Sequence, residues 1–476
     1  MRGKGKTMPN NNVLPRGKII QYFLADIAKG LFNGMIGNYL LYFYQPTAAS
    51  GLPNLLPSNK ILGFITIMAL ITGVSKVVDA VTDPLVANWS DKCTSKWGRR
   101  MPFLRASAIP YAVCVLLIFF APFTAGSVLN AVWVGFFIVM YYVAYTLYFI
   151  PQRALIPEII PDPKMRVGYY AISTVFFMGS SAVMYATTLF VNLFKNAGFS
   201  PLWSWRLVFL IFAVVGLICL LASAFAFNEK KYLQHTSIPT DSFLQSFKSV
   251  FKNKNFVIFT IGDLASYISM AFFQTTMIYY IVDLIRIPES QAFLVMLAAI
   301  VTAIACFPLI LHISRKYNKR ILLIIASFLF TALFFLIYFG DSIVSLMPGH
   351  ELLLGILMGI AVAYPFAAIN VLPQAVVSDI IQADSLQNGV NREGIFSASK
   401  SFIEKIGYAI AMVIVSSVLA IGAAPGETVT LQGIKLTGLF ASGFSLVSAI
   451  FFVIYDDKKV MRIIKKYRQE QPDDKN

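Results

Sequence analysis

Twelve apolar segments of helix length run through this 476-residue chain, and they constrain its fold more than any other feature. A helix needs about 20 apolar residues to cross a hydrocarbon core about 30 Å thick, and lipid offers its backbone no outside partner. The alternating strands of a β-barrel are only about 10 residues long. We therefore expect an all-α membrane protein with 12 transmembrane helices. The segments cover about 19–44, 61–89, 103–124, 129–156, 168–195, 203–228, 254–283, 289–314, 320–340, 350–373, 395–424 and 434–455.

The charged fraction excludes most alternatives to a membrane protein. Only 13% of the residues are charged, against roughly 25% in soluble domains, and the mean hydropathy is +0.70. Soluble domains could not bury so much apolar surface in a chain of this length. Three of the four cysteines lie inside apolar segments, so we expect no disulfide framework.

Motifs typical of enzyme active sites are missing from the sequence. It contains no P-loop and no HExxH, GxSxG or CxxC pattern, and its three histidines lie far apart. We therefore expect neither an enzyme nor a cofactor. Without an ATP site, transport would draw on an ion gradient, with Na⁺ or H⁺ as the coupling ion.

The basic residues are distributed unevenly between the two sides that the segments define. Of the 39 Lys and Arg, 30 fall on the side of the termini, 5 on the other side and 4 within the segments. Cytoplasmic loops of membrane proteins carry such an excess. We expect a multi-pass protein of the cell (inner) membrane with both termini cytoplasmic. Anionic membrane lipids then account for the net charge of +16, and no nucleic-acid partner is expected.

A long polar stretch divides the segments into two sets of six. Similar basic turns follow the second and the eighth segment, which suggests a duplicated six-helix unit. The alternative is that any cytosolic turn is basic. The domains that we predict are a cytosolic tail at 1–18, an N-terminal six-helix bundle at 19–228, a cytosolic linker at 229–253, a C-terminal six-helix bundle at 254–455 and a cytosolic tail at 456–476.

The segment 61–89 carries charges that are costly at membrane depth unless they are paired or hydrated. Asp79, Thr82 and Asp83 are spaced i, i+3 and i+4, so they share one helix face, with Lys76 close by. Two carboxylates and a hydroxyl suit a small hard cation, and either Na⁺ or H⁺ would relieve their repulsion. The alternative is that Lys76 neutralises Asp79 and that Asp83 caps the helix near the cytosol.

The segment 395–424 contains two lysines. Lys405 lies ten residues into it and needs a partner, for which the aspartates of the second segment are candidates. The alternative is that its side chain extends to the membrane interface. For Lys400, which lies nearer the cytosolic start of the segment, we expect that extended arrangement.

Other polar residues within the segments give weaker signals. Asp26 and Lys29 are spaced i, i+3 and either pair with each other or contact a substrate. Taken alone, Thr146 is typical of a threonine that bonds its own helix backbone. Tyr145 belongs to a cluster of tyrosines that either packs in the bundle or stacks on a sugar ring.

A specific motif covers the second half of the segment 61–89 and the turn that follows. It reads Asp79-Ala80-Val81-Thr82-Asp83-Pro84-Leu85-Val86, then Ser90-Asp91, then Trp97-Gly98-Arg99-Arg100-Met101-Pro102-Phe103. This motif resembles the signature of the glycoside–pentoside–hexuronide:cation symporters, of which the melibiose carrier is a member. Further stretches that agree with the family extend the resemblance over most of the chain.

The resemblance implies a fold and a set of roles. The fold is that of the major facilitators, with two six-helix bundles around a central cavity and alternating access. Asp79 and Asp83 would bind the coupling cation, Na⁺ in a sodium-coupled member, with Thr82 and Thr146 as neighbouring oxygen ligands. Lys405 would link the cation site to the substrate site.

The sequence departs from the family where neutral sugars are bound. Phe149 occupies the position of an acidic sugar ligand, and Arg153 occupies the position of an aromatic residue one turn later. The sugar-binding aspartate of the first helix falls on Gly30. A different glycoside, an acidic sugar bound by Arg153 and Lys405, or a solute that is not a sugar all stay open.

These observations predict a secondary active transporter that couples Na⁺ or H⁺ to the symport of a sugar, a glycoside or a related organic solute. The alternatives are a carrier of lysolipids or other amphiphiles and a membrane receptor that moves nothing. We expect a monomer whose partners are a small-molecule solute and membrane lipids. The predicted substrate-binding residues are Asp26, Lys29, Tyr145, Phe149, Arg153, Asn370, Ser401 and Lys405.

Overall fold

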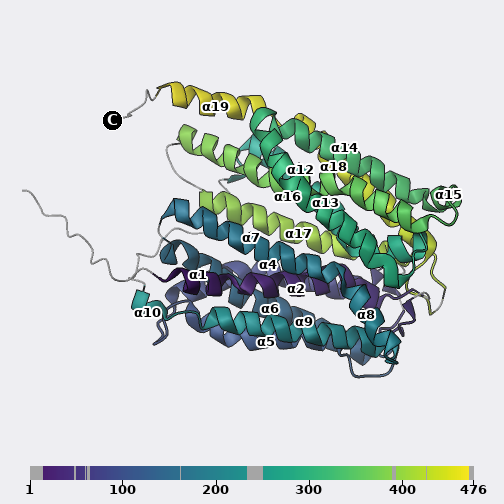
Figure 1. Ribbon diagram of the computed structural model, residues 1–476. Helices are drawn as coiled ribbons and strands as arrows, with labels where there is room; N and C mark the ends of the chain where they lie inside the picture. The colour runs from purple at the N-terminus through teal and green to yellow at the C-terminus, as the bar shows by residue number, and fades with distance from the viewer. Residues whose placement is uncertain are drawn as a thin grey trace, which may run out of the picture.

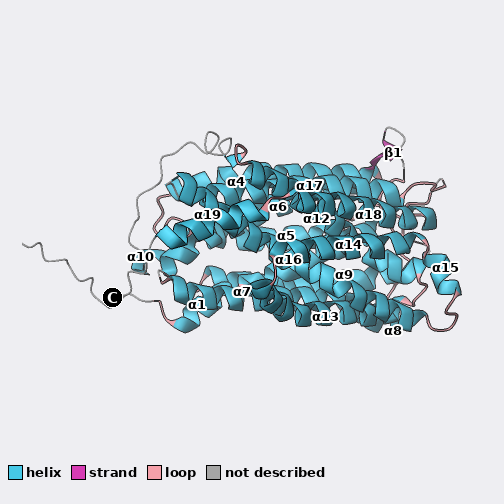
Figure 2. Cartoon of the chain, turned by 90° about the horizontal axis from the view of Figure 1, so that it is seen from above, coloured by secondary structure: helices cyan, strands magenta, loops and turns pink. Residues whose placement is uncertain are grey.

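The protein is a bundle of long helices whose axes are nearly aligned (Figures 1 and 2). The computed structural model describes residues 14–47, 50–58, 60–61, 65–160, 162–232, 250–388, 393–424 and 426–470. Its helices are α1 (Arg16–Phe23), α2 (Ala25–Gly34), the π-helix η1 (Met35–Tyr39), α3 (Leu40–Tyr44), α4 (Ile67–Lys92), α5 (Met101–Phe119), α6 (Val128–Ile159), α7 (Pro163–Tyr185), α8 (Thr187–Asn196), α9 (Pro201–Ala224), α10 (Glu229–Tyr232), α12 (Lys254–Tyr279), the π-helix η3 (Tyr280–Leu284), α13 (Glu289–Lys316), α14 (Lys319–Tyr338), α15 (Gly340–Ser345), α16 (Glu351–Asn388), α17 (Glu393–Leu419), α18 (Leu431–Ile454) and α19 (Asp457–Glu470). Two short strands, β1 (Lys60–Ile61) and β2 (Ile65–Thr66), pair before α4.

The predicted all-α membrane fold is confirmed. Within the described residues, nine helices are long and apolar enough to cross a membrane, and the bent pair α7 and α8 makes ten. Of the other two predicted segments, one is α4, which is 26 residues long but contains Lys76, Asp79 and Asp83. The other is divided among α1, α2, η1 and α3, none of which is long enough alone. Each of the twelve predicted segments therefore falls on one helix or on a broken run of helices.

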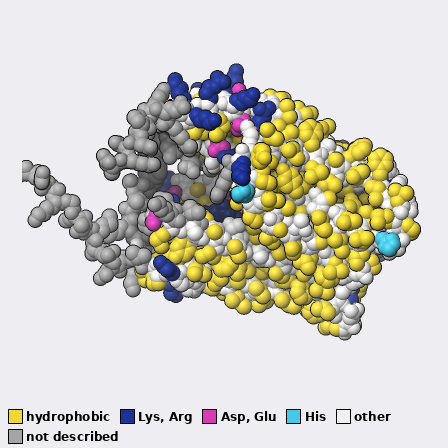
Figure 3. All heavy atoms as spheres, turned by 45° about the horizontal axis from the view of Figure 1, so that its top comes forward, with side chains coloured by type: hydrophobic (Ala, Val, Ile, Leu, Met, Phe, Trp, Pro, Cys, Tyr) yellow, Lys and Arg dark blue, Asp and Glu magenta, His cyan; other side chains and the backbone are white. Residues whose placement is uncertain are grey.

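The outside of the bundle is apolar. Large side chains such as Leu85, Val175 and Ile218 are more than 60% exposed, and Figure 3 shows hydrophobic atoms covering most of the visible face. Monomeric soluble proteins rarely expose apolar patches of such extent, whereas a membrane protein turns them towards lipid.

The helices form two groups, which we name the N-terminal half (α1–α9) and the C-terminal half (α12–α18). In the first, α2 packs on α7 and α9, and α5 packs on α6 and α9. In the second, α12 packs on α17 and α18, and α14 packs on α16 and α18. The halves meet along α4 and α17 and along α8 and α13. Figure 1 shows the two halves lying one above the other.

The described chain begins and ends at the same end of the bundle, which also carries α10 (Figure 1). At the opposite end, polar contacts join the two halves. Ser416 Oγ donates to Gln45 Oε1 at 2.8 Å, and the Tyr279 hydroxyl donates to the Gln45 carbonyl at 2.9 Å. Lys195 of α8 forms an ion pair with Glu289 of α13. We call this the closed end. Figure 3 shows a hollow at the other, terminal end.

Parts of the predicted domain plan lie outside the described residues, namely most of the tail 1–18, positions 233–249 of the linker and the last six residues. The predicted linker starts with the short helix α10. Most of the predicted C-terminal tail is the helix α19. The boundaries of the domains stay a prediction.

Candidate functional site

A cavity of about 620 Å³ lies between the two halves. Its volume falls in the range of small-molecule sites, about 300–1,000 Å³. It is lined from the N-terminal half by α2, η1, α4, α6 and α7, and from the C-terminal half by α12, α13, α16 and α17. The lining combines charged groups, amides, hydroxyls and aromatic rings, and includes Lys29, Asn33, Asn38, Lys76, Asp79, Tyr142, Tyr145, Phe177, Gln274, Asn370, Ser401, Glu404, Lys405 and Tyr408. Such a lining suits a polar solute of moderate size.

Lys405 joins the two halves at the wall of this cavity. From α17 its ammonium lies 2.9 Å from Asp79 Oδ1 and 2.7 Å from Asp83 Oδ2, both on α4. The Asp79 side chain is 2% exposed, whereas Asp83 is 23% exposed. The lysine therefore has partners within the membrane span, and the alternative in which it extends to the interface is wrong.

A second lysine lies beside one of these carboxylates. Lys76 Nζ lies 3.5 Å from Asp79 Oδ2. The same ammonium lies 4.0 Å from the ring centre of Tyr142 and 4.7 Å from that of Tyr408, so two aromatic faces hold it in place. The aspartate pair is thus opposed by two lysines, and an entering cation would have to displace an ammonium group.

Two threonines complete a set of oxygen atoms around the aspartates. Thr146 Oγ1 of α6 lies 3.3 Å from Asp79 Oδ1 and 3.1 Å from Asp83 Oδ1, and it is fully buried. Thr82 Oγ1 lies 3.4 Å from Thr146 Oγ1 and also donates to the Asp79 carbonyl at 3.1 Å. Thr146 therefore contacts the carboxylates of another helix, and the alternative in which it bonds only its own helix is wrong.

The chemistry of this set fits a hard cation or a proton. All candidate ligands are oxygen atoms, which hard cations prefer. Among the described residues, no group of three or more His, Cys, Asp or Glu side chains could hold a metal ion. A cation at Asp79 and Asp83 would therefore take its further ligands from the hydroxyls of Thr82 and Thr146.

The expectation for Lys400 is wrong. Its side chain is only 5% exposed and does not reach an interface. Its ammonium lies 2.9 Å from Asp263 Oδ2 of α12 and also pairs with Glu404 one turn along its own helix. Burial of a charge is costly without such partners, and they account for a lysine at this depth.

Helix α2 places its two charged residues differently from the predicted pair. The Ser173 hydroxyl of α7 donates to Asp26 Oδ2 at 2.6 Å. Lys29 instead lies 5.6 Å from the ring centre of Phe149 and 5.4 Å from that of Phe177. Within the described residues no acidic side chain lies at ion-pair distance from Lys29, so the pairing of Asp26 with Lys29 is wrong. The Lys29 ammonium therefore lies at the cavity wall without a direct ion pair in the described part of the chain.

The position where the family has a sugar-binding aspartate is filled by close packing. A Cβ atom added to Gly30 would lie 2.0 Å from Ser180 Oγ and 2.5 Å from the Phe177 carbonyl oxygen. Real Cβ atoms essentially never come that close to other atoms. Helix α2 therefore packs so closely against α7 at Gly30 that no larger side chain fits there.

Five of the eight predicted substrate-binding residues line the cavity, namely Lys29, Tyr145, Asn370, Ser401 and Lys405. The other three do not. Asp26 and Phe149 are buried beside the cavity, and Arg153 is exposed.

Sequence reasoning missed other lining groups, among them the amides Asn33, Asn38 and Gln274. An amide inside an apolar segment would have been a usable signal, because it needs a hydrogen-bond partner there. Tyr408 was also missed, and its role as a face for Lys76 depends on a contact between α17 and α4.

Comparison with known proteins places the chain in a family. The model of a family described as MFS/sugar transport protein matches residues 21–455, which is nearly the whole chain. The chain belongs to the MFS/sugar transport family. Membership identifies it as a multi-pass membrane transporter and not an enzyme.

Two relatives and one solved structure resemble the chain along most of its length. A symporter of uncharacterized function, sll1374, from Synechocystis sp. (strain ATCC 27184 / PCC 6803 / Kazusa) is 23% identical, with 87% of this chain and 88% of the relative covered. The isoprimeverose transporter of Lactiplantibacillus pentosus is 24% identical, with 87% and 82% covered. The crystal structure of the nucleoside transporter NupG superimposes with a TM-score of 0.64 at 14% identity and covers 93% of this chain and 99% of that one. The last likeness shows the shared fold.

Proposed function

We propose that the chain is a symporter that uses Na⁺ or H⁺ to drive a sugar, a glycoside or a related organic solute across the membrane by alternating access. The observation that carries this proposal is the contact of Lys405, from one half, with Asp79 and Asp83, from the other, at the wall of a central cavity. Among its relatives, the name of the symporter supports coupled transport, and the name of the isoprimeverose transporter supports the proposed class of substrate.

The geometry suggests how ion and solute are coupled. Without a coupling ion, Lys405 and Lys76 neutralise the two carboxylates. A cation or proton bound at Asp79 and Asp83 takes over that neutralisation, and the Lys405 ammonium becomes free to donate to a solute in the cavity. Each ligand then favours the binding of the other, which is a coupling free energy between two sites.

The described state is open at the terminal end. The closed end is joined by Gln45, Ser416 and Tyr279, while Figure 3 shows a hollow at the terminal end. With the excess of basic residues on the side of the termini, this end would face the cytoplasm. We therefore assign the described state as inward-facing.

The charge of the cavity favours a substrate with an acidic group. Lys29 lies at the wall without an acidic partner within ion-pair distance among the described residues, and two aromatic rings flank it. A carboxylate on a sugar would form an ion pair with this ammonium, and the sugar ring could stack on Phe177, which also lines the cavity. A uronic acid or its glycoside therefore fits this cavity better than a neutral sugar does.

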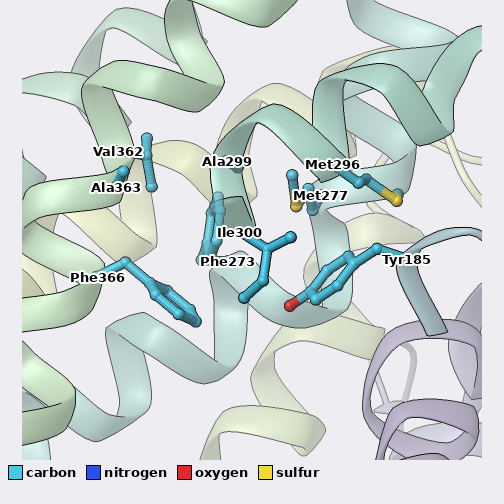
Figure 4. A pocket seen from close by; sticks show the side chains of 9 residues that line it. All are labelled: Tyr185, Phe273, Met277, Met296, Ala299, Ile300, Val362, Ala363 and Phe366. Carbon is cyan, nitrogen blue, oxygen red and sulfur yellow. The ribbon is translucent and has the colours of Figure 1, made fainter. Parts of the chain in front are cut away.

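A lysolipid is less suited to the cavity. The apolar chamber beside it, lined by Tyr185, Met277, Met296, Ile300 and Phe366 among others, has a volume of about 10 Å³. Figure 4 shows Tyr185 of α7 facing Ile300 of α13, with Phe366 of α16 beyond it. Such a volume holds about one water molecule and no acyl chain.

A ligand-stabilisation screen of the purified protein tests the proposal. Neutral glycosides, uronates and lysolipids would each be added with and without Na⁺, at two pH values, because a bound ligand raises the apparent melting temperature by mass action. We expect a uronate or glycoside to raise it, and more so with the coupling ion present. Stabilisation by lysolipids alone would contradict the proposal. A hit would then be followed as uptake into proteoliposomes under a Na⁺ or H⁺ gradient.

A further inference from the structure

A second hollow, whose lining shares no residue with that of the central cavity, lies at the terminal end of the C-terminal half. Its volume is about 870 Å³, and its walls come from the end of α13, the start of α14, α16 and α19. Basic side chains dominate the lining, which includes Lys316, Lys319, Lys458, Arg462, Lys465 and Lys466. Figure 3 shows dark-blue Lys and Arg side chains gathered at this end of the molecule, at the edge of the hydrophobic surface. The transport cycle proposed above makes no use of these residues.

The two acidic residues of the hollow are engaged within the protein. Asp379 Oδ2 lies 2.6 Å from Lys319 Nζ, and Asp457 Oδ2 accepts from the Asn318 amide at 2.7 Å. In the part of the chain that the structure describes, no acidic side chain lies within ion-pair distance of four other cations, which are Lys316, Lys458, Arg462 and Lys465. All four are exposed. The hollow therefore has an excess of positive charge that faces outwards.

The position of α19 explains why its basic residues gather there. Val460 and Ile464 are 2% and 3% exposed, because the apolar face of the helix packs against the protein, where α16 is its neighbour. Lys458, Arg462 and Lys465 are spaced i, i+4 and i+7 and lie on the other face. Helix α19 thus buries its apolar face in the protein and does not need it for insertion into lipid, while its cations line the hollow.

An apolar strip leads from the hollow along the outside of the bundle. Tyr317, at the rim, is 65% exposed. Ile321, Ile325 and Phe328 follow on α14 at spacings of four and three residues, and each is about half exposed, at 53%, 50% and 48%. They lie on one helix face, so a headgroup in the hollow could extend its acyl chains along this strip.

We propose that this hollow binds the headgroup of an anionic phospholipid of the adjoining membrane leaflet. A phosphate group would accept from the Arg462 guanidinium and from the ammonium groups of Lys316, Lys458 and Lys465. Basic pockets at the membrane surface of helical proteins bind lipid headgroups in this way. The apolar strip distinguishes a lipid from a free phosphate, which would make no use of it.

Titration of the purified full-length protein in a neutral detergent tests the proposal. The probes are phosphatidylglycerol, phosphatidylcholine and inorganic phosphate at equal concentration, and the readouts are the apparent melting temperature and the number of lipids retained in native mass spectrometry. The test variant carries R462Q and K465Q. The matched control carries K92Q and K96Q, which remove the same charge from exposed positions of the N-terminal half.

We expect phosphatidylglycerol to raise the melting temperature of the parent and of the control, and the test variant to lose most of that rise and one retained lipid. Phosphatidylcholine and inorganic phosphate should give little rise. An equal loss in both double variants, or no loss in either, would overturn the proposal. A rise with inorganic phosphate as large as that with phosphatidylglycerol would also overturn it, because the site would then be one for free phosphate.

Discussion

Lys405 Nζ of α17 and Asp79 Oδ1 of α4 lie 2.9 Å apart, and this ion pair joins the two halves of the transporter at the wall of the cavity. The same ammonium reaches Asp83 at 2.7 Å. One side chain thus occupies the place where a coupling ion would bind and lines the place where a solute would bind. Because this contact spans the two halves, a movement of one half relative to the other acts on it directly. This ties the binding of the ion and the solute to the conformational change.

Replacement of Lys405 by Gln should uncouple the cation from the solute. We expect the coupling ion to bind at least about tenfold more tightly without substrate, because about 1.4 kcal/mol of competition by the ammonium would be lost. Substrate should no longer strengthen that binding. Both effects can be measured as the shift in melting temperature against Na⁺ concentration or pH. Ion binding that stays unchanged in the variant would contradict the displacement of Lys405.

Replacement of Thr146 by Val removes a hydroxyl and keeps the shape of the side chain. Because this hydroxyl lies within 3.3 Å of both carboxylates, we expect the affinity for the coupling ion to fall about tenfold or more. Thr146→Ser keeps the hydroxyl and is the matched control. The measurement is the ion concentration at half-maximal uptake, and an equal loss in both variants would show that packing, not the hydroxyl, matters.

Replacement of Gly30 by Ala should destabilise the protein, because the new Cβ would collide with Ser180 and with the backbone of Phe177. Overpacking of this kind costs about 1–3 kcal/mol. Gly179→Ala, in α7, is the control, because a Cβ there would meet nothing within 4 Å. A chemical-unfolding or thermal series should therefore separate the two variants. Equal stability of both would contradict the close packing of α2 on α7.

Replacement of Lys400 by Gln leaves Asp263 and Glu404 without their shared cation. Breaking a buried ion pair costs about 3–5 kcal/mol, so we expect a clear loss of thermal stability. Combining Lys400→Gln with Asp263→Asn should recover part of it, since fewer buried charges are then unpaired. Lys92→Gln, at an exposed position, is the control. A double variant less stable than the sum of the single changes would contradict this account of the cluster.

Sequence reasoning recovered the fold and the cluster around Asp79 because both follow from the cost of placing polar groups in lipid. Apolar segments must form helices there, and Asp79, Asp83 and Lys405 must find partners, which they find in one another. The same cost did not reveal which partner a charge takes. Lys400 pairs with Asp263 of α12, a helix that is far away in the sequence but packs against α17. Asp26 accepts from Ser173 and not from nearby Lys29. Such contacts depend on how helices pack, which spacing along one helix does not specify.

Accumulation of substrate by the Asp83→Asn variant tests the central claim most directly. The variant would be reconstituted in proteoliposomes beside the parent and beside Asp341→Asn, a control whose carboxylate pairs with Lys435 away from the cavity. An inward gradient of the coupling ion would then be imposed. The account predicts that Asp83→Asn fails to concentrate substrate above the outside level, while the control does so as the parent does. Accumulation by Asp83→Asn equal to that of the parent would contradict the assignment of Asp79 and Asp83 as the coupling site.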